Sequence, residues 1–330
     1  MLKVPEWLRC PPIDPIAYQR LAERVGRCHL DQRLGIEHDF EARAFGQGRT
    51  LFHIENWYSA HGLIRLALRA ALLHDKGRRN AREIEVRRNE IQLFGLPPAF
   101  DGFTLLHLSD LHLDLADDIP DAIAQAVSVA GRYDICVLTG DYRGKTFGPY
   151  EPALMGLQRV LEAVDTTTYG ILGNHDTIRM VPGLEDMGVH MLLNEVVSLE
   201  REGQAIYLAG IDDPHYYRAD NMEKAVDRIP REATSILLSH SPEMFRHAAY
   251  AQFDMMLSGH THGGQICLPG GIPIMLNAKA PRALCKGPWR YRQLQGYTSA
   301  GAGVCIVDVR LNCPPEITLH TLRRAEQLIQ

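Results

Sequence analysis

The chain has 330 residues, of which 45% are hydrophobic, and its 35 lysines and arginines stand against 40 aspartates and glutamates. This composition is typical of a globular protein and excludes a disordered or fibrous chain. The slight negative charge leads us to expect no nucleic-acid partner, because binding a polyanion requires a basic surface.

Cysteine spacing and the lack of targeting signals indicate the cytoplasm. The seven cysteines include no CxxC pair, which is typical of reduced thiols. The first residues, MLKVPEWLRCPPIDP, lack the apolar core of a signal peptide, and no run of about 18 apolar residues follows. We therefore expect a cytoplasmic protein whose membrane contact, if it has one, is peripheral and on the inner face.

Residues 1–90 are expected to form a mainly helical N-terminal region. Asp14 and Pro15 are typical of a helix start and Gly26 of a helix end, so a helix is predicted between them. A second, amphipathic helix is predicted over 55–82, where an apolar sector lies beside a stripe formed by His61, Arg65 and Arg69. Such a helix either packs on the neighbouring domain or lies on an anionic membrane surface, and both alternatives stay open.

The catalytic domain is predicted to span residues 91–330. A strand is expected at 84–93, and after it short apolar runs repeatedly end in Asp, Asn or His. These runs are FTLLHLSDLH, DICVLTGD, TYGILGNHD, TSILLSH and DMMLSGHTH. Helical segments at 119–132 and 151–164 separate several of them, which indicates an α/β fold with ligands beyond the carboxyl ends of buried strands.

The polar residues at these strand ends form a set of nitrogen and oxygen metal ligands. Asp110 and His112 are two residues apart, as are His260 and His262, so each pair can converge on one ion. The full set is large enough for two divalent ions and consists of Asp110, His112, Asp141, Asn174, His240, His260 and His262. Asp141 is the natural bridge, because one carboxylate can bind two metals. The lack of thiolate favours manganese, with iron or zinc as alternatives.

These motifs, in this order, resemble those of the calcineurin-like metallophosphoesterase superfamily. The resemblance rests on SDLH, GD, GNHD, SH and GHTH, and it covers roughly residues 100–320. It implies a four-layer α/β/β/α sandwich. It also implies that one metal is held by Asp110, His112 and His262, the other by Asn174, His240 and His260, with Asp141 between them. His175 would then be the catalytic histidine that protonates the leaving oxygen or stabilises the phosphoryl charge, with Asp176 holding its imidazole.

The implied reaction is hydrolysis of a phosphate ester or pyrophosphate bond, with a metal-bridging hydroxide as nucleophile. A covalent serine route is disfavoured, because no serine lies in a GxSxG sequence. SGHTHGGQICLP and PPEITLHTLR resemble the bacterial phosphodiesterase subgroup that includes UDP-2,3-diacylglucosamine hydrolases, so a lipid-linked nucleotide is one expected substrate. The alternatives are a phosphomonoesterase or phosphodiesterase acting on soluble small molecules and a non-catalytic scaffold of the same fold.

Three places are candidates for substrate contacts. The sequence GDYRGK departs from the family, which often has a carboxylate or amide shortly after GD, and Arg143 stands near that position. Arg143 either contacts a substrate phosphate or pairs with a surface carboxylate. His215, in GIDDPHYYRAD, is the second candidate, although the polar residues there could equally cap a turn. The third is the loop 268–289, whose apolar residues would suit acyl chains if they are exposed.

Overall fold

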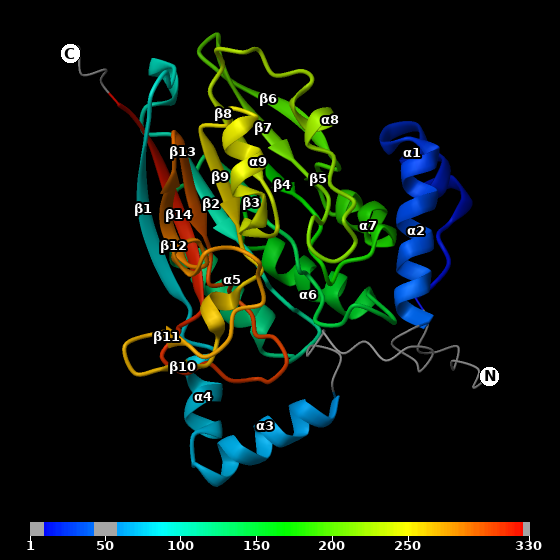
Figure 1. The fold of residues 1–330 in the computed structure, drawn as a ribbon, viewed down its shortest axis with the longest axis vertical. Helices are drawn as coiled ribbons and strands as arrows, with labels where there is room; N and C mark the ends of the chain where they lie inside the picture. Colours follow the sequence, from blue (N-terminus) through cyan, green and yellow to red (C-terminus); the bar gives the residue numbers. More distant parts are fainter. Residues whose placement is uncertain (1–9, 43–57, 326–330) are drawn as a thin grey trace.

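The structure is a computed structural model that describes residues 10–42 and 58–325, and its centre is a pair of facing sheets (Figure 1). The first sheet has the order β1 (Glu85–Leu93), β14 (Glu316–Arg324), β2 (Thr104–Leu108), β3 (Ile135–Leu138), β4 (Thr168–Gly170) and β5 (Val189–Met191). The second has the order β12 (Gly287–Tyr291), β13 (Leu294–Thr298), β9 (Met255–Ser258), β8 (Ser235–Leu238), β7 (Gln204–Gly210) and β6 (Glu195–Arg201). A short hairpin is formed by β10 (Cys267–Leu268) and β11 (Ile272–Pro273).

Helices cover the outer faces of both sheets. The helices of the described residues are α1 (Pro15–Val25), α2 (Arg27–Ala42), α3 (Tyr58–Ala70), α4 (His74–Asn80), α5 (Ile119–Val129), α6 (Glu151–Leu161), α7 (Val181–Asp186), α8 (Met222–Val226) and α9 (Phe245–Tyr250). None of the helices in the described ranges is long and apolar enough to span a membrane.

Side-chain alternation along the strands builds the layers. In β2, Leu105 belongs to the core between the two sheets, whereas Leu106 belongs to the core under α5 and α6. In β8, Leu238 faces the central core and Leu237 packs with Phe245 of α9. The result is a four-layer α/β/β/α sandwich, and the predicted fold is confirmed.

The strand directions bring the polar strand ends to one region of the sandwich. In the first sheet β2, β3, β4 and β5 are parallel, and in the second β13, β9, β8 and β7 are parallel. Every residue of β3, β8 and β9 is buried, which explains why the sequence shows continuous apolar runs there instead of alternation. The carboxyl ends of these strands carry the residues that we predicted to bind metal.

The first helix matches its prediction. The Asp14 side chain accepts hydrogen bonds from the backbone N–H groups of Ile16 and Ala17, both at 3.0 Å, and the helix ends before Gly26. Farther along, β1 pairs in parallel with β14 from Glu85 to Leu93, so the strand that crosses the predicted domain boundary at residue 90 is an edge of the first sheet.

The single helix predicted over 55–82 is wrong: its described part forms two helices, α3 and α4, while 55–57 lie outside the described residues. Leu72 has a positive φ of 57°, and Leu73 N–H bonds back to the carbonyl of Leu68 at 2.9 Å. This is a Schellman-type helix end with leucine where glycine is usual, so the sequence carries no stop signal. On α3, Ile64 and Leu68 pack against residues 307–311, whereas Leu63 and Leu66 are exposed.

Candidate metal centre

Several of the predicted metal ligands have an unusual backbone conformation. Positive φ values occur at Asp110 (53°), His112 (44°), Asp141 (59°), His260 (71°) and His262 (49°), each just beyond the end of a strand. Non-glycine residues adopt this left-handed region rarely, and the strain persists only where the surroundings impose it. Such strain is common at functional sites, so the turns after β2, β3 and β9 become candidates on conformation alone.

The first group of side chains lies around the turn after β2. Ligand atoms of Asp110, His112 and Asp141 all lie within 4.8 Å of one another. His262 joins this group, because its Nε2 atom lies 3.0 Å from His112 Nε2 and 3.5 Å from Asp110 Oδ1. All four side chains are buried or nearly so, which excludes most of the water that would otherwise compete with them.

A second group shares Asp141 with the first. Ligand atoms of Asp141, His240 and His260 also lie within 4.8 Å of one another. His240 Nε2 is 3.3 Å from Asp141 Oδ2 and 2.9 Å from the Asn174 side-chain oxygen. All seven residues predicted to bind metal are thus gathered in one buried cluster, with the Asp141 carboxylate between its halves.

The surroundings of the histidines fit a metal ion. His112 and His240 each have Nδ1 against a backbone carbonyl, that of Arg143 at 2.8 Å and that of Thr139 at 2.7 Å, which turns Nε2 toward the cluster. His260 Nε2 is buried and has no hydrogen-bond partner in residues 10–42 and 58–325. A buried nitrogen without a hydrogen-bond partner is energetically unfavourable unless another group binds it. A cation that accepts the nitrogen lone pair would do so.

Burial and mutual charge set the protonation of the cluster. Burial lowers the pKa of His112 to about 4 and those of His260 and His262 well below the ordinary value, so these imidazoles are neutral ligands at pH 7. Burial raises the pKa of Asp110 to about 6, with the Asp141 charge adding to the effect. For His240, burial lowers the pKa but the Asp141 charge outweighs it, and the result is about 10. In the protein alone, a proton on His240 therefore provides the positive charge that a metal ion would bring.

The predicted catalytic pair differs in part from expectation. His175 lies at the cluster, with its backbone N–H on Asp141 Oδ1 at 2.8 Å and its Nε2 4.0 Å from Asp141 Oδ2. We expected Asp176 to hold the His175 imidazole, but Nδ1 of that ring lies 3.0 Å from the Gly144 carbonyl instead. The Asp176 carboxylate accepts backbone N–H bonds, including those of Asp141 at 2.7 Å and Gly173 at 2.8 Å. Asp176 therefore fixes the turns that carry the site, and a carbonyl orients the imidazole.

The prediction that Arg143 contacts a substrate phosphate also needs correction. This side chain is only 1% exposed. Its Nε donates to the carbonyl of His175 and its Nη1 to that of Gly148, at 3.0 Å. A guanidinium held by two carbonyls beneath the surface supports the His175 turn and does not face a ligand.

The other predicted contacts lie near the cluster or on the surface. The His215 ring is 4.2 Å from that of His260, centroid to centroid, and its Nδ1 is 3.0 Å from the Glu243 carboxylate. Asp213 accepts the backbone N–H bonds of Tyr216 and Tyr217, so the polar residues of this loop do cap a turn. In the loop 268–289, exposed apolar side chains include Leu268, Ile272, Ile274 and Met275.

Three residues near the site were missed by the sequence analysis. Arg33 of α2 is buried and donates to the Asp176 carbonyl at 3.1 Å. Arg310 lies 3.3 Å from Nδ1 of His262. The Cys305 thiol lies within 4.8 Å of ligand atoms of His112 and His262, although we expected no sulfur donor. No local pattern marks these residues, because each meets the site only through contacts distant in sequence.

Comparison with known proteins identifies the family. Residues 103–264 match the calcineurin-like phosphoesterase family. This segment of the chain is a calcineurin-like phosphoesterase domain. An uncharacterized metallophosphoesterase of Bacillus subtilis, YkoQ, is 29% identical over 257 residues, which are 75% of this chain and 93% of the relative. The phosphodiesterase YaeI of Escherichia coli is 27% identical over 237 residues, or 67% of this chain and 82% of the relative. A bovine transmembrane protein with a metallophosphoesterase domain is 27% identical over 328 residues, which cover 90% of this chain and 71% of the relative.

The match to the calcineurin-like phosphoesterase family defines the reaction class. The chain is a hydrolase that acts on phosphoester bonds. Divalent metal ions are typical of the family, and the buried cluster contains groups that could hold them.

Proposed function

We propose that the chain hydrolyses a phosphodiester or pyrophosphate bond with two divalent ions held by the buried cluster. The observation that carries this proposal is the Asp141 carboxylate, which belongs to both ligand groups. Asp110, His112 and His262 would hold one ion, and Asn174, His240 and His260 the other. The buried Nε2 of His260, which has no hydrogen-bond partner among the described residues, supports the second position.

The ions would supply a nucleophile at neutral pH by lowering the pKa of water and would neutralise charge on the phosphoryl oxygens. The chain itself supplies the proton. The His175 imidazole is oriented by the Gly144 carbonyl through Nδ1, and its Nε2 lies at the cluster, where it would protonate the leaving oxygen. The Asp176 carboxylate contributes by holding the backbone of the neighbouring turns.

Manganese is our first choice of metal, with iron or zinc as alternatives. Six of the seven proposed ligands are carboxylate or imidazole groups and one is an amide, which suits these borderline ions. The Cys305 thiol beside His112 and His262 is a softer donor, and it favours iron or zinc if it binds.

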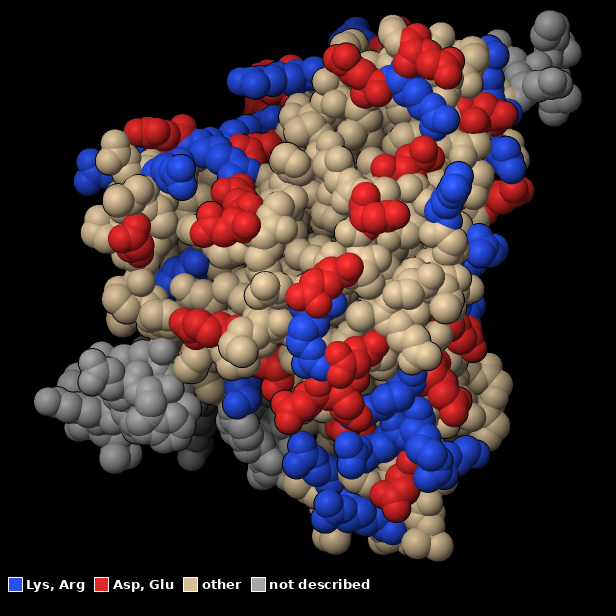
Figure 2. All heavy atoms as spheres, turned by 180° about the vertical axis from the view of Figure 1, so that it is seen from behind, with Lys and Arg blue, Asp and Glu red and all other residues tan. Residues whose placement is uncertain are grey.

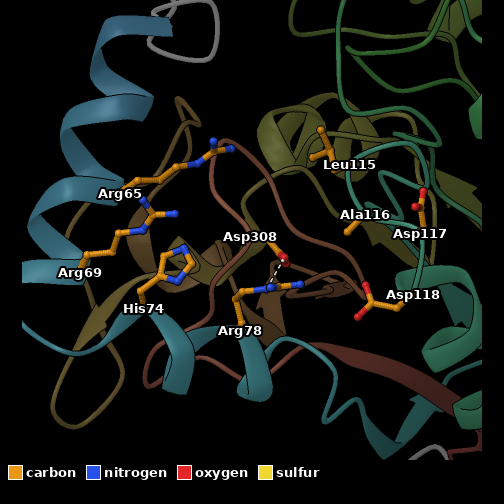
Figure 3. Close-up of a pocket in the computed structure, with 9 residues that line it drawn as sticks. All are labelled: Arg65, Arg69, His74, Arg78, Leu115, Ala116, Asp117, Asp118 and Asp308. Atoms are coloured by element: carbon orange, nitrogen blue, oxygen red, sulfur yellow. Dashed lines mark hydrogen bonds and ion pairs between the residues drawn. The ribbon is translucent and has the colours of Figure 1, made fainter.

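A lipid-linked nucleotide such as UDP-2,3-diacylglucosamine, met at an anionic membrane surface, is the substrate that we propose to test first. Basic side chains gather at the end of the molecule formed by α3 and α4, with acidic ones among them (Figure 2). A hollow of about 490 Å³ lies there, and Arg65 and Arg69 point into it from α3 (Figure 3). Among the residues that the structure describes, these two arginines have no carboxylate partner, whereas Arg78 pairs with Asp308 at 2.9 Å.

Exposed leucines of the same helix favour contact with lipid. Leu63 and Leu66 are 68% and 64% exposed, and they lie on the same helix as Arg65 and Arg69. An apolar face next to basic side chains is the pattern of an interfacial helix that binds anionic headgroups. A phosphomonoesterase or phosphodiesterase acting on soluble small molecules is the alternative.

The test is hydrolysis by manganese-loaded protein of bis-p-nitrophenyl phosphate and p-nitrophenyl phosphate, followed by UDP-2,3-diacylglucosamine with and without anionic vesicles. We expect Asp141→Asn to lose bound metal and activity together, and His175→Ala to keep the metal, measured by elemental analysis, while turnover falls at least a hundredfold. Metal retained by Asp141→Asn at full stoichiometry would contradict the bridging role. Loss of vesicle stimulation in Arg65→Gln/Arg69→Gln, but not in the equally neutralised control Arg20→Gln/Arg27→Gln, would support the membrane surface.

A further inference from the structure

A second cavity, of about 370 Å³, opens beside the candidate metal centre and is mainly apolar. Its inner end is formed by Asp141, His175, His260 and His262. Its remaining wall comes from segments far apart in the sequence and includes Ile64, Ile266, Ile274, Met275, Ile306 and Val307. A cleft lined by polar groups of the candidate metal centre and by aliphatic side chains matches a ligand that has one polar and one aliphatic part.

The wall at Ile306 has a strained backbone. Ile306 has a φ of 65°, and Val307 N–H donates to the Cys305 carbonyl at 2.6 Å, which closes a tight three-residue turn. A β-branched residue is a genuine outlier in this region, because its side chain crowds its own backbone. This backbone conformation places the Ile306 side chain at the cavity, although isoleucine is energetically disfavoured in this conformation.

Gln265 holds the strained turn in place. Its side-chain nitrogen donates to the carbonyls of Cys305 and Val307, at 2.7 and 2.9 Å, and its oxygen accepts from the Cys305 N–H at 2.7 Å. These three bonds fix the wall from behind. They also use both N–H groups of the amide, so the Gln265 side chain offers the cavity no donor.

The remaining wall offers few polar partners to a ligand. The Thr261 hydroxyl donates to the Cys285 carbonyl at 2.6 Å. Ile274 and Met275 are 59% and 50% exposed, which leaves apolar surface uncovered at the cavity. Asn277 and Cys305 add two polar side chains to this wall, so a sugar or a base lying along it would replace few of its hydrogen bonds to water, whereas an aliphatic chain would gain by burial.

We propose that this cavity binds an aliphatic chain of the substrate, attached near the phosphoester whose phosphorus lies at the metal centre. The assignment rests on the proposed function, because it is defined relative to a phosphoester bound at the cluster. The chain is held by Ile274 and Met275 on one side and by Ile64, Ile306 and Val307 on the others. Its contacts do not change during the reaction, so they lower KM and leave kcat unaltered.

The test uses a series of p-nitrophenyl alkyl phosphates with ethyl, butyl, hexyl and octyl groups, kept below their micelle concentrations. KM is expected to fall by up to about fourfold for each methylene group that becomes enclosed. In Ile274→Ser/Met275→Ser this dependence on chain length is expected to disappear. Both side chains are largely exposed, so the variant should fold, and Ile16→Ser on α1, a site that is 69% exposed, is the matched control.

A binding measurement separates this proposal from the proposed function. Ethyl and octyl phosphate are titrated calorimetrically into the metal-free protein, where the longer chain should bind more tightly and with a more negative heat-capacity change. Equal affinities together with equal KM values across the diester series would overturn the chain site and leave the phosphoesterase intact. Tighter binding of octyl phosphate without hydrolysis of any diester would overturn the proposed function and leave the chain site standing.

Discussion

Removing the guanidinium of Arg33 tests whether the N-terminal helices are part of the folded catalytic unit. Arg33 lies on α2, and its Nε donates to Asp212 at 3.1 Å, with both side chains fully buried. Its Nη1 lies 2.9 Å from Glu37, an ion pair without hydrogen-bond geometry, and its guanidinium stacks 3.5 Å from the Tyr217 ring centroid. The Arg33 charge lowers the pKa of Asp212 against the effect of burial, which would raise it.

The expected loss of unfolding free energy follows from the carboxylates that stay buried when the Arg33 guanidinium is removed. In Arg33→Met, Glu37 keeps Arg179, Thr177 and Ile178 as partners. Asp212 is left with the N–H of Asp213 and with His29 at 3.8 Å. An unpaired buried charge destabilises by about 3–5 kcal/mol, and we expect a loss in that range.

The assay is urea unfolding at pH 7, with Arg27→Met as the control. Arg27 is also on α2, but it is 84% exposed and lies 3.7 Å from Asp31, so its loss should change stability by less than about 0.5 kcal/mol. Arg33→Met/Asp212→Leu should be more stable than Arg33→Met alone, because it no longer buries a lone carboxylate. If Arg33→Met lowers the free energy of unfolding by no more than Arg27→Met does, the reasoning is refuted.

Three further predictions concern the site and the core. A Cβ at Gly259 would overlap the Ser109 hydroxyl and the Asp110 carboxylate. Gly259→Ala should therefore lower the free energy of unfolding by about 1–3 kcal/mol and reduce the amount of bound metal. The control is Gly35→Ala, because no atom lies within 4 Å of a Cβ at that position. Arg143→Met should lower kcat for a diester with little change in KM, because the guanidinium supports the His175 turn. A raised KM with unchanged kcat would instead indicate that Arg143 contacts the substrate. Burial holds the pKa of His320 well below its ordinary value, so the unfolded chain binds the proton first and stability falls as the pH drops below about 6.5. His320 contributes about 1.4 kcal/mol per pH unit to that fall, so the pH slope of stability in urea titrations should be smaller by this amount in His320→Gln, and equal slopes would contradict it.

Local sequence determined the strands, the first helix and the membership of the metal cluster. The apolar runs that end in SDLH, GD, GNHD, SH and GHTH specify where buried strands stop, and parallel strands present their ends at one edge. Asp14 and Gly26 fixed the limits of α1 in the same way, since capping depends on neighbours in the chain. These features are readable because the atoms that interact are close in sequence or repeat with a regular period.

Tertiary structure decided what each polar group at the site touches. Asp176 meets backbone N–H groups and not the imidazole, and Arg143 is enclosed by carbonyls, because the turns after β3 and β4 pack against each other. The break at Leu72 and the strained turn at Ile306 use residues that disfavour positive φ, so they exist only where packing and the bonds of Gln265 impose them. A cavity has no sequence signature for the same reason: its walls come from segments that meet only after folding.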